Sequence, residues 1–316
     1  MTASEPSSPQ SGTPTPQKTA PHVFDAELRR IRRARAVRRA VKSDKPAFFI
    51  PRCAEDAADR MQDINRRFER ALIIGPPDFW PQLRELLPTD KHPTTVVQAY
   101  DIDPDDAADF GLDIGAPDDG LPIDGPKYDL IISVLSLHSV NDLPGALLNM
   151  RHILKADGLM MASLFGGDSL RELRTVFYSV EAERLGGMSP RIFPMIDFSQ
   201  AAQLLQRTGY ALPVVDTDRF TVNYGALSTL IGDIRDSGDS NVAVARDRRH
   251  LSRDFLKALE AAYRAQFSNE AGKITASFEI LWMTGWAPHD SQQKPLKPGS
   301  AKMRLSDALG AKEIKI

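Results

Sequence analysis

Short apolar segments alternate with helical segments along residues 54–286 of this chain. The most apolar segment covers residues 128–135, and residues 71–74 and 159–165 have the same continuous apolar character. Such strands, separated by helices, are typical of a mostly parallel sheet that helices cover on both faces. The predicted strands are 71–74, 95–98, 128–135, 159–165, 214–222 and 277–286, and the predicted helices are 54–70, 79–87, 143–154, 169–185 and 199–208, with a turn at 155–158. The sequence therefore predicts an α/β fold.

The composition shows no strong charge bias. Among the 316 residues, 40 are basic and 42 are acidic, so no overall excess points to nucleic acid or to a membrane surface. The single cysteine, Cys53, excludes an internal disulfide framework and a multi-thiolate zinc site. No apolar run approaches the roughly 20 residues that span a bilayer, and the chain starts without the features of a secretory signal. We therefore expect a cytoplasmic protein, either free or peripheral at the inner membrane.

Changes in amino-acid composition divide the chain into four parts. Residues 1–21 are rich in Pro, Ser and Thr and poor in large apolar groups, so we expect a disordered N-terminal segment. Residues 22–53 form a basic helical arm, and residues 54–288 form the α/β domain. Residues 289–316 are rich in Lys, Gln, Gly and Ser, and we expect them to form a C-terminal tail.

Charge is distributed unevenly although the total is nearly balanced. Nine aspartates and no lysine or arginine occupy residues 101–124. Seven arginines are crowded into the basic arm, at Arg29, Arg30, Arg32, Arg33, Arg35, Arg38 and Arg39. One interpretation of these arginines is a solvated helix; the other is an arm that binds an acidic partner surface, a membrane surface or RNA. No aromatic residue interrupts the run, so base stacking is not expected there, and we expect no DNA partner.

Three loops should meet at the carboxyl ends of the parallel strands, where ligands bind in open α/β sheets. These loops follow the strands that end near residues 74, 98 and 135. Asp101 and Asp103 follow the second strand, where a carboxylate suits the two hydroxyls of a ribose. Asp118 and Asp119 precede an apolar run in the next loop, where they suit an adenine amino group. Each aspartate has the alternative interpretation of a solvated loop residue.

Two further segments follow predicted strands. His138 comes after the most apolar strand. Its candidate roles are a general base, a substrate contact and a structural histidine. Asp168 lies in Gly166-Gly167-Asp168-Ser169, where either Asp168 or Ser169 suits a helix N-cap. The two glycines would also let a ligand approach the main chain, and Asp168 suits pairing with a substrate guanidinium. The six histidines show no His-x-Asp/Glu spacing, so no metal site is predicted.

Several of these runs resemble the class I S-adenosylmethionine-dependent methyltransferase family. The general elements are residues 119–123 (DGLPI), 128–133 (YDLIIS) and 155–158 (KADG). Runs similar to the mitochondrial complex I assembly-factor branch of this family are 136–144 (SLHSVNDLP), 165–174 (FGGDSLRELR), 215–218 (VDTD), 222–224 (VNY) and 283–286 (MTGW), and the opening Phe24-Asp25 also fits. The resemblance covers about residues 22–306.

The resemblance implies a Rossmann-like class I methyltransferase fold, with a mostly parallel seven-stranded sheet flanked by helices. It implies S-adenosylmethionine as the cofactor, bound through Gly75, Asp101, Asp118, Asp119 and Ser136, with His138 and Asp168 as candidate catalytic residues. The branch implies an arginine hydroxylase that acts on a subunit of respiratory complex I, located in the mitochondrial matrix in eukaryotic relatives. Malonyl-carrier-protein methyltransferases are close to this branch.

The first loop departs from the family pattern, which is rich in glycine. Only Gly75 remains, and Pro76 and Pro77 have no backbone N–H and a fixed φ. Phe79 and Trp80 add bulk at the start of the following helix. The loop therefore predicts that cofactor binding is weakened, remodelled or lost. The first functional hypothesis is a protein-modifying enzyme that hydroxylates or methylates an arginine of a complex I subunit. The second is a noncatalytic assembly factor that binds a partner protein, and the third is a small-molecule or carrier-protein O-methyltransferase.

Overall fold

The computed structural model describes residues 22–43, 45–115 and 128–293. Its seven strands form one sheet in the order β3-β2-β1-β4-β5-β7-β6. All neighbouring strands from β3 to β5 are parallel, and β7 is antiparallel to both β5 and β6. The strands are β1 (Arg70–Ile74), β2 (Thr95–Tyr100), β3 (Ile114–Gly115), β4 (Tyr128–Val134), β5 (Leu154–Phe165), β6 (Ala211–Tyr224) and β7 (Ile274–Trp286). The predicted mostly parallel, seven-stranded sheet is confirmed.

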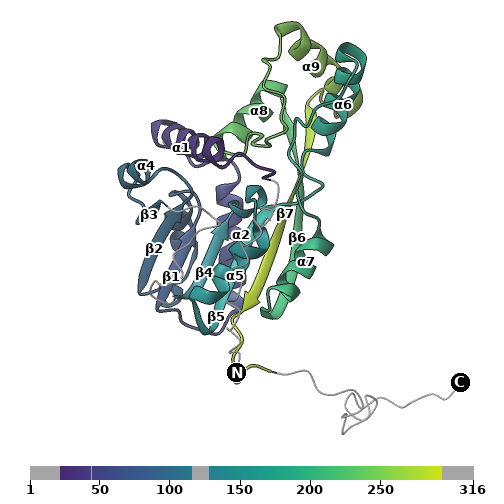
Figure 1. Cartoon of the computed structure of the whole chain (residues 1–316). Coiled ribbons are helices and arrows are strands. Elements are labelled where there is room, and N and C mark those ends of the chain that lie inside the picture. Colours follow the sequence, from purple (N-terminus) through teal and green to yellow (C-terminus); the bar gives the residue numbers. More distant parts are fainter. Residues whose placement is uncertain (1–21, 44, 116–127, 294–316) are drawn as a thin grey trace, which may run out of the picture.

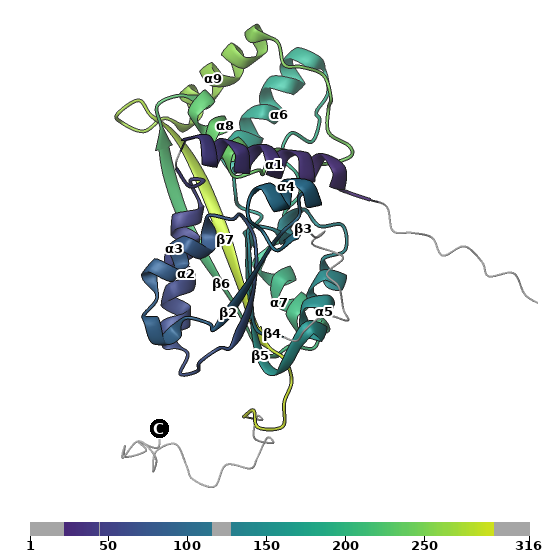
Figure 2. The same ribbon diagram turned by 90° about the vertical axis from the view of Figure 1, so that its left-hand side faces the viewer.

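Helices cover both faces of the sheet (Figures 1 and 2). The helices are α1 (Ala26–Ser43), α2 (Ile50–Asp63), α3 (Phe79–Leu86), α4 (Pro104–Asp109), α5 (Leu143–Ile153), α6 (Arg171–Leu185), α7 (Phe198–Arg207), α8 (Leu227–Asp236) and α9 (Arg253–Phe267). Figure 1 shows α6, α8 and α9 beyond the upper end of the sheet, which is the end where the parallel strands finish. This end is called the carboxyl edge below.

The strands divide their side chains between two apolar cores because successive residues point to opposite faces. In β1, Ala71 and Ile73 pack with α2, α3, α6 and α9, whereas Leu72 and Ile74 pack with α5 and α7. Strand β4 is buried along its whole length, as its continuous apolar sequence predicts. The two cores hold the strands in register, and this register fixes the positions of the loops at the carboxyl edge.

Several boundaries differ from the prediction. The helix expected at 54–70 begins at Ile50 and ends at Asp63, and the turn expected at 155–158 belongs to β5. Asp157 adopts a φ of 61°, and β4 pairs with Leu154 and then with Leu159, so residues 155–158 form a bulge in β5. Helices α4, α8 and α9 were not predicted. No helix in the described part of the chain is both long enough and apolar enough to cross a membrane.

The basic arm folds onto the domain. Helix α1 lies across the carboxyl edge, as both views in Figures 1 and 2 show. Arg29, Arg33 and Val37 share one face of α1, since they are four residues apart, and all three are buried. At the other end of the chain, Gln292 donates hydrogen bonds to Asp157 and to the Ala287 carbonyl. The predictions for residues 1–21 and for the tail from residue 294 concern residues outside the described ranges.

Candidate functional site

Asp101, the predicted ribose ligand, lies directly after β2 and is fully buried. Its Oδ2 accepts a hydrogen bond from Arg29 Nε at 2.7 Å, and Arg33 Nη1 lies 3.3 Å from the same oxygen. Its Oδ1 accepts a hydrogen bond from Arg30 Nε at 3.0 Å. Asp101 and these three arginines are called the Asp101 cluster below. Both carboxylate oxygens are therefore engaged by helix α1.

The cluster also ties α1 to the loop after β4. Arg33 donates to the backbone carbonyl of Ser136 at 2.7 Å, and Arg29 donates to the carbonyl of Ser139 at 2.5 Å. The Arg33 guanidinium lies 5.1 Å from the centre of the Tyr100 ring. Ser136, a predicted cofactor ligand, is fully buried, and its hydroxyl donates to the Val134 carbonyl at 3.1 Å. Helix α1 thus covers the ends of both β2 and β4.

The first loop offers few free backbone donors. The N–H of Gly75 donates to the Ala99 carbonyl at 2.9 Å, and Pro76 and Pro77 have no N–H. Phe79 points into the apolar core with no exposed surface, so its bulk does not fill the carboxyl edge. Pro76 and Pro77 instead line a cavity of about 500 Å³ beneath the last turns of α1.

S-adenosylmethionine does not fit the described residues in this conformation. A ribose would have to replace three guanidinium groups on Asp101, which has no surface accessible to solvent. The first loop also lacks the backbone donors that a cofactor carboxylate would need. Asp118 and Asp119, the predicted adenine contacts, lie outside the described residues.

His138, a predicted catalytic residue, is held between aromatic rings. Its ring stacks on Phe193, with centres 5.6 Å apart, and lies 5.1 Å from the ring of Phe165. Its Nε2 lies 2.7 Å from Oδ1 of Asp239. The buried Nδ1 of His138 and Oδ2 of Asp239 have no hydrogen-bond partner among the described residues. His138 and Asp239 therefore form a buried acid–imidazole pair, and the catalytic role of His138 stays a prediction.

Asp168, the second predicted catalytic residue, takes part in binding a guanidinium group. Glu279 on β7 accepts a hydrogen bond from Arg219 Nε at 2.9 Å, and Arg219 Nη2 lies 2.7 Å from the same Glu279 oxygen. Asp168 Oδ2 lies 3.6 Å from that Nη2. The Asp168 N–H donates to the other Glu279 oxygen at 3.1 Å. Glu279, Asp168 and Arg219 are called the guanidinium site below.

Sequence reasoning missed Glu279, although a signal was present. Glu279 is the one charged residue in β7, and it is nearly fully buried. A charge at such a position requires a partner, because desolvation of an unpaired carboxylate is costly. Phe165 pairs with Ile280 across the sheet, so Glu279 lies at the carboxyl end of β5 beside Gly166.

The predicted N-cap at Asp168 or Ser169 was wrong. Helix α6 begins after Leu170, which has a φ of 58°, and no side chain caps it. The Ser169 hydroxyl instead donates to the Glu279 carbonyl at 2.9 Å and accepts from the Glu279 N–H at 3.0 Å. Ser169 thus fixes the backbone of Glu279, and this contact positions the guanidinium site.

Gly166 is required by the Glu279 side chain. A Cβ added at Gly166 would lie 2.8 Å from Cδ of Glu279, which is closer than carbon atoms approach without displacement. We expect Gly166→Ala to displace this carboxylate from Arg219 and to cost about 1–3 kcal/mol of unfolding free energy by overpacking. Gly167→Ala is the matched control, since its nearest neighbours would lie 3.8 Å from the new Cβ. Urea unfolding of both variants tests this, and equal stabilities would contradict it.

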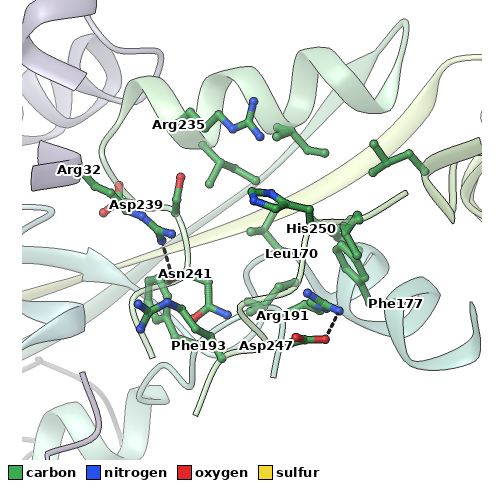
Figure 3. A pocket seen from close by; sticks show the side chains of 18 of the residues that line it. Arg32, Leu170, Phe177, Arg191, Phe193, Arg235, Asp239, Asn241, Asp247 and His250 are labelled. Carbon is green, nitrogen blue, oxygen red and sulfur yellow. Dashed lines mark hydrogen bonds and ion pairs between the residues drawn. The ribbon is translucent and has the colours of Figure 1, made fainter. Parts of the chain in front are cut away.

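A cavity of about 780 Å³ lies between α1, α6, α8 and the segments 191–195 and 239–251 (Figure 3). Seven arginines and two aspartates line it, together with ten large apolar side chains. Arg32, Arg35 and Arg39 come from one face of α1, which is adjacent to the face of the buried pair Arg29 and Arg33. This cavity is called the arginine cavity below.

Acidic partners neutralise part of the arginine cavity. The paired arginines are Arg39 with Asp236, Arg246 with Asp25, and Arg191 and Arg249 with Asp247. The hydrogen bond from Arg249 lowers the pKa of Asp247 to about 2, so Asp247 is ionised at neutral pH. Arg32 donates to the carbonyl of Asn241, and Arg32, Arg35 and Arg235 have no ion-pair partner among the described residues. The cavity therefore carries a net positive charge.

The strand order, the antiparallel β7 and an acid directly after β2 define a class I methyltransferase fold. One solved structure to which the chain is similar is the N-methyltransferase NodS from Bradyrhizobium japonicum in complex with S-adenosyl-L-homocysteine. It has a TM-score of 0.41 and 12% identity, and the match covers 82% of this chain and all of that one. No family model matches the chain.

Curated relatives narrow this class to a family. The mitochondrial arginine-hydroxylase NDUFAF5 of Rattus norvegicus is 37% identical over 310 residues, which cover 95% of this chain and 87% of that protein. The chain therefore belongs to the NDUFAF5 arginine-hydroxylase family. The Dictyostelium discoideum member is 43% identical over 189 residues, but the match spans only 43% of that relative's length. A malonyl-[acyl-carrier protein] O-methyltransferase of Xylella fastidiosa is 33% identical over 53% of this chain and 55% of that protein.

Proposed function

We propose that this protein binds an arginine of a protein client, a subunit of respiratory complex I, and takes part in its hydroxylation or methylation during assembly. Hydroxylation would consume O2 and two electrons from a separate reductant, and methylation would consume S-adenosylmethionine bound after α1 has released Asp101. The names of its relatives supply the arginine-hydroxylase class. The observation that carries the proposal is the guanidinium site, where Glu279 and Asp168 already hold the side chain of Arg219. The relatives are named as mitochondrial proteins. This protein would act in the cytoplasm or at the surface of the inner membrane, or in the mitochondrial matrix as expected for the eukaryotic relatives.

The guanidinium site suits an exchange of one arginine for another. The Arg219 side chain is 64% exposed, whereas that of Glu279 is 4% exposed, so Arg219 covers the carboxylate from the solvent side. Loss of Arg219 alone would leave the buried Glu279 carboxylate unpaired, so the exchange costs little only when an incoming guanidinium takes the place of Arg219. An incoming guanidinium would find the same carboxylate of Glu279 and the exposed carboxylate of Asp168.

Mass spectrometry of complex I subunits tests the modification. Cells with the wild-type protein should carry a modified arginine that is absent from cells lacking it. A gain of about 16 Da marks oxygen insertion, and a gain of about 14 Da marks methylation. We expect Glu279→Gln to lower the modified fraction at least about tenfold, since charge-assisted hydrogen bonds are the stronger ones.

A matched control keeps this test specific. Glu260→Gln removes the same charge from a partly exposed ion pair with Arg264 on α9, and it should leave the modified fraction unchanged. Far-UV circular dichroism of both variants separates a loss of recognition from a loss of folding. Full modification by a folded Glu279→Gln protein would contradict the proposed site.

A second candidate function is a noncatalytic assembly factor that binds a partner protein. The Asp101 cluster favours it, because α1 engages the carboxylate that a cofactor ribose would need. An acidic partner surface was expected for the whole arginine run. Arg29 and Arg33 are buried in the cluster and Arg38 pairs with Asp106, so such a partner would meet chiefly the exposed Arg35. Under this alternative, client binding persists and weakens with salt, and no mass change is found.

A further inference from the structure

The arginine cavity has two regions of opposite character. Figure 3 shows Leu170 and Phe177 on one wall, with Arg32 and Arg235 at the side formed by α1 and α8. Its volume of about 780 Å³ lies within the range of small-molecule sites, about 300–1,000 Å³. Such sites combine apolar walls with a few polar groups that orient the ligand. The cavity therefore has the size and lining of a ligand site.

Three guanidinium groups of the cavity repel one another. Burial lowers the pKa of Arg32, and the neighbouring Arg246, Arg35 and Arg235 lower it further. Asp25 offsets part of this effect on Arg32 but forms its ion pair with Arg246, and Arg32, Arg35 and Arg235 form no ion pair within the described part of the protein. An anionic group that sits among these three arginines would relieve their repulsion and gain charge-assisted hydrogen bonds.

We propose that the arginine cavity binds a small anionic amphiphile, with a phosphate or carboxylate group at Arg32, Arg35 and Arg235 and an apolar body against Leu173 and Phe177. An arginine side chain of a client would be repelled here, so this site is distinct in charge from the guanidinium site. The apolar walls favour a molecule with a hydrophobic body over a simple inorganic anion.

Isothermal titration of the full chain with dodecyl phosphate, below its micelle concentration, tests the proposal. We expect saturable binding of one molecule per chain. Inorganic phosphate, which lacks the apolar body, and dodecyltrimethylammonium, which carries the opposite charge, should give no saturable binding over the same concentrations. If dodecyltrimethylammonium binds as tightly as dodecyl phosphate, the binding is apolar adsorption that does not depend on charge, and the proposal is overturned.

Two variants and one control locate the anion. Arg35→Gln and Arg235→Gln, at exposed positions on different helices, should each weaken dodecyl phosphate binding at least about tenfold. Arg207→Gln, on the exposed surface of α7, removes the same charge and should change nothing. Unchanged affinity of both cavity variants would overturn the proposal. A hexa-aspartate peptide that binds more tightly, with the same dependence on Arg35 and Arg235, would assign the cavity to a protein partner instead.

Discussion

Asp101→Asn is expected to destabilise the protein by about 3–5 kcal/mol, because it leaves buried arginine charges without their carboxylate. Arg29 and Arg33 are each 1% exposed, and Arg29 Nη2 already has no hydrogen-bond partner among the described residues. The amide of Asn can accept hydrogen bonds but carries no charge, so it cannot offset the desolvation of two guanidinium groups. Urea unfolding followed by circular dichroism measures the loss.

The matched control is Asp216→Asn. Asp216 pairs with Arg60 at 2.5 Å, but its side chain is 49% exposed. Exposed ion pairs contribute about 0–1 kcal/mol, so this variant should remain close to the wild type. Equal losses for Asp101→Asn and Asp216→Asn would show that the Asp101 cluster is no more important for stability than a surface pair.

The parallel strands could be predicted because their signal is local. Strand β4 is apolar except for Asp129 and Ser133, and its predicted and observed limits differ by one residue. Helix α9 also had a readable pattern, with Phe255, Leu259 and Tyr263 buried at intervals of four and Ser252 capping its start. Helix α4 is only six residues long and is acidic, so its sequence looks like a loop.

The partners of the site residues could not be predicted, because they lie far away in sequence. Asp101 was expected after β2 and lies there, but its partner Arg29 is 72 residues away. Similarly, Asp168 was expected to hold a guanidinium, whereas the main acceptor is Glu279, 111 residues further along the chain. Sequence patterns give the position of a charge on the fold, but only tertiary packing decides which opposite charge satisfies it.

Helix α1 explains how one arginine run takes two roles. At 100° per residue, Arg29 and Arg33 share one side of the helix, while Arg32, Arg35 and Arg39 share another. The first side closes onto Asp101, and the second side lines the arginine cavity. Arg29 and Arg33 therefore fit neither the solvated helix nor the binding arm, and an acidic partner for the arginines of the second side stays a prediction. A movement of α1 would therefore change the shape of the carboxyl edge and of the arginine cavity together.

S-adenosylmethionine is expected to bind the wild-type chain weakly, with no saturation up to about 1 mM, because α1 must first release Asp101. If that release costs about 3 kcal/mol, roughly 1% of the molecules are open and the apparent affinity falls about a hundredfold. The double variant Arg29→Met/Arg33→Met removes the two buried competitors for the carboxylate. We expect it to bind S-adenosylmethionine at least about tenfold more tightly than the wild type, measured by isothermal titration.

The control for this titration is Arg35→Met/Arg38→Met, which removes the same charge from the same helix at exposed positions. It should bind S-adenosylmethionine no better than the wild type, since neither arginine contacts Asp101. A folded Arg29→Met/Arg33→Met protein that still fails to bind would place the obstruction in the first loop, where Pro76 and Pro77 supply no backbone N–H. Tight binding by the wild type would contradict the closed site directly, because a carboxylate held by three guanidinium groups cannot also bind a ribose.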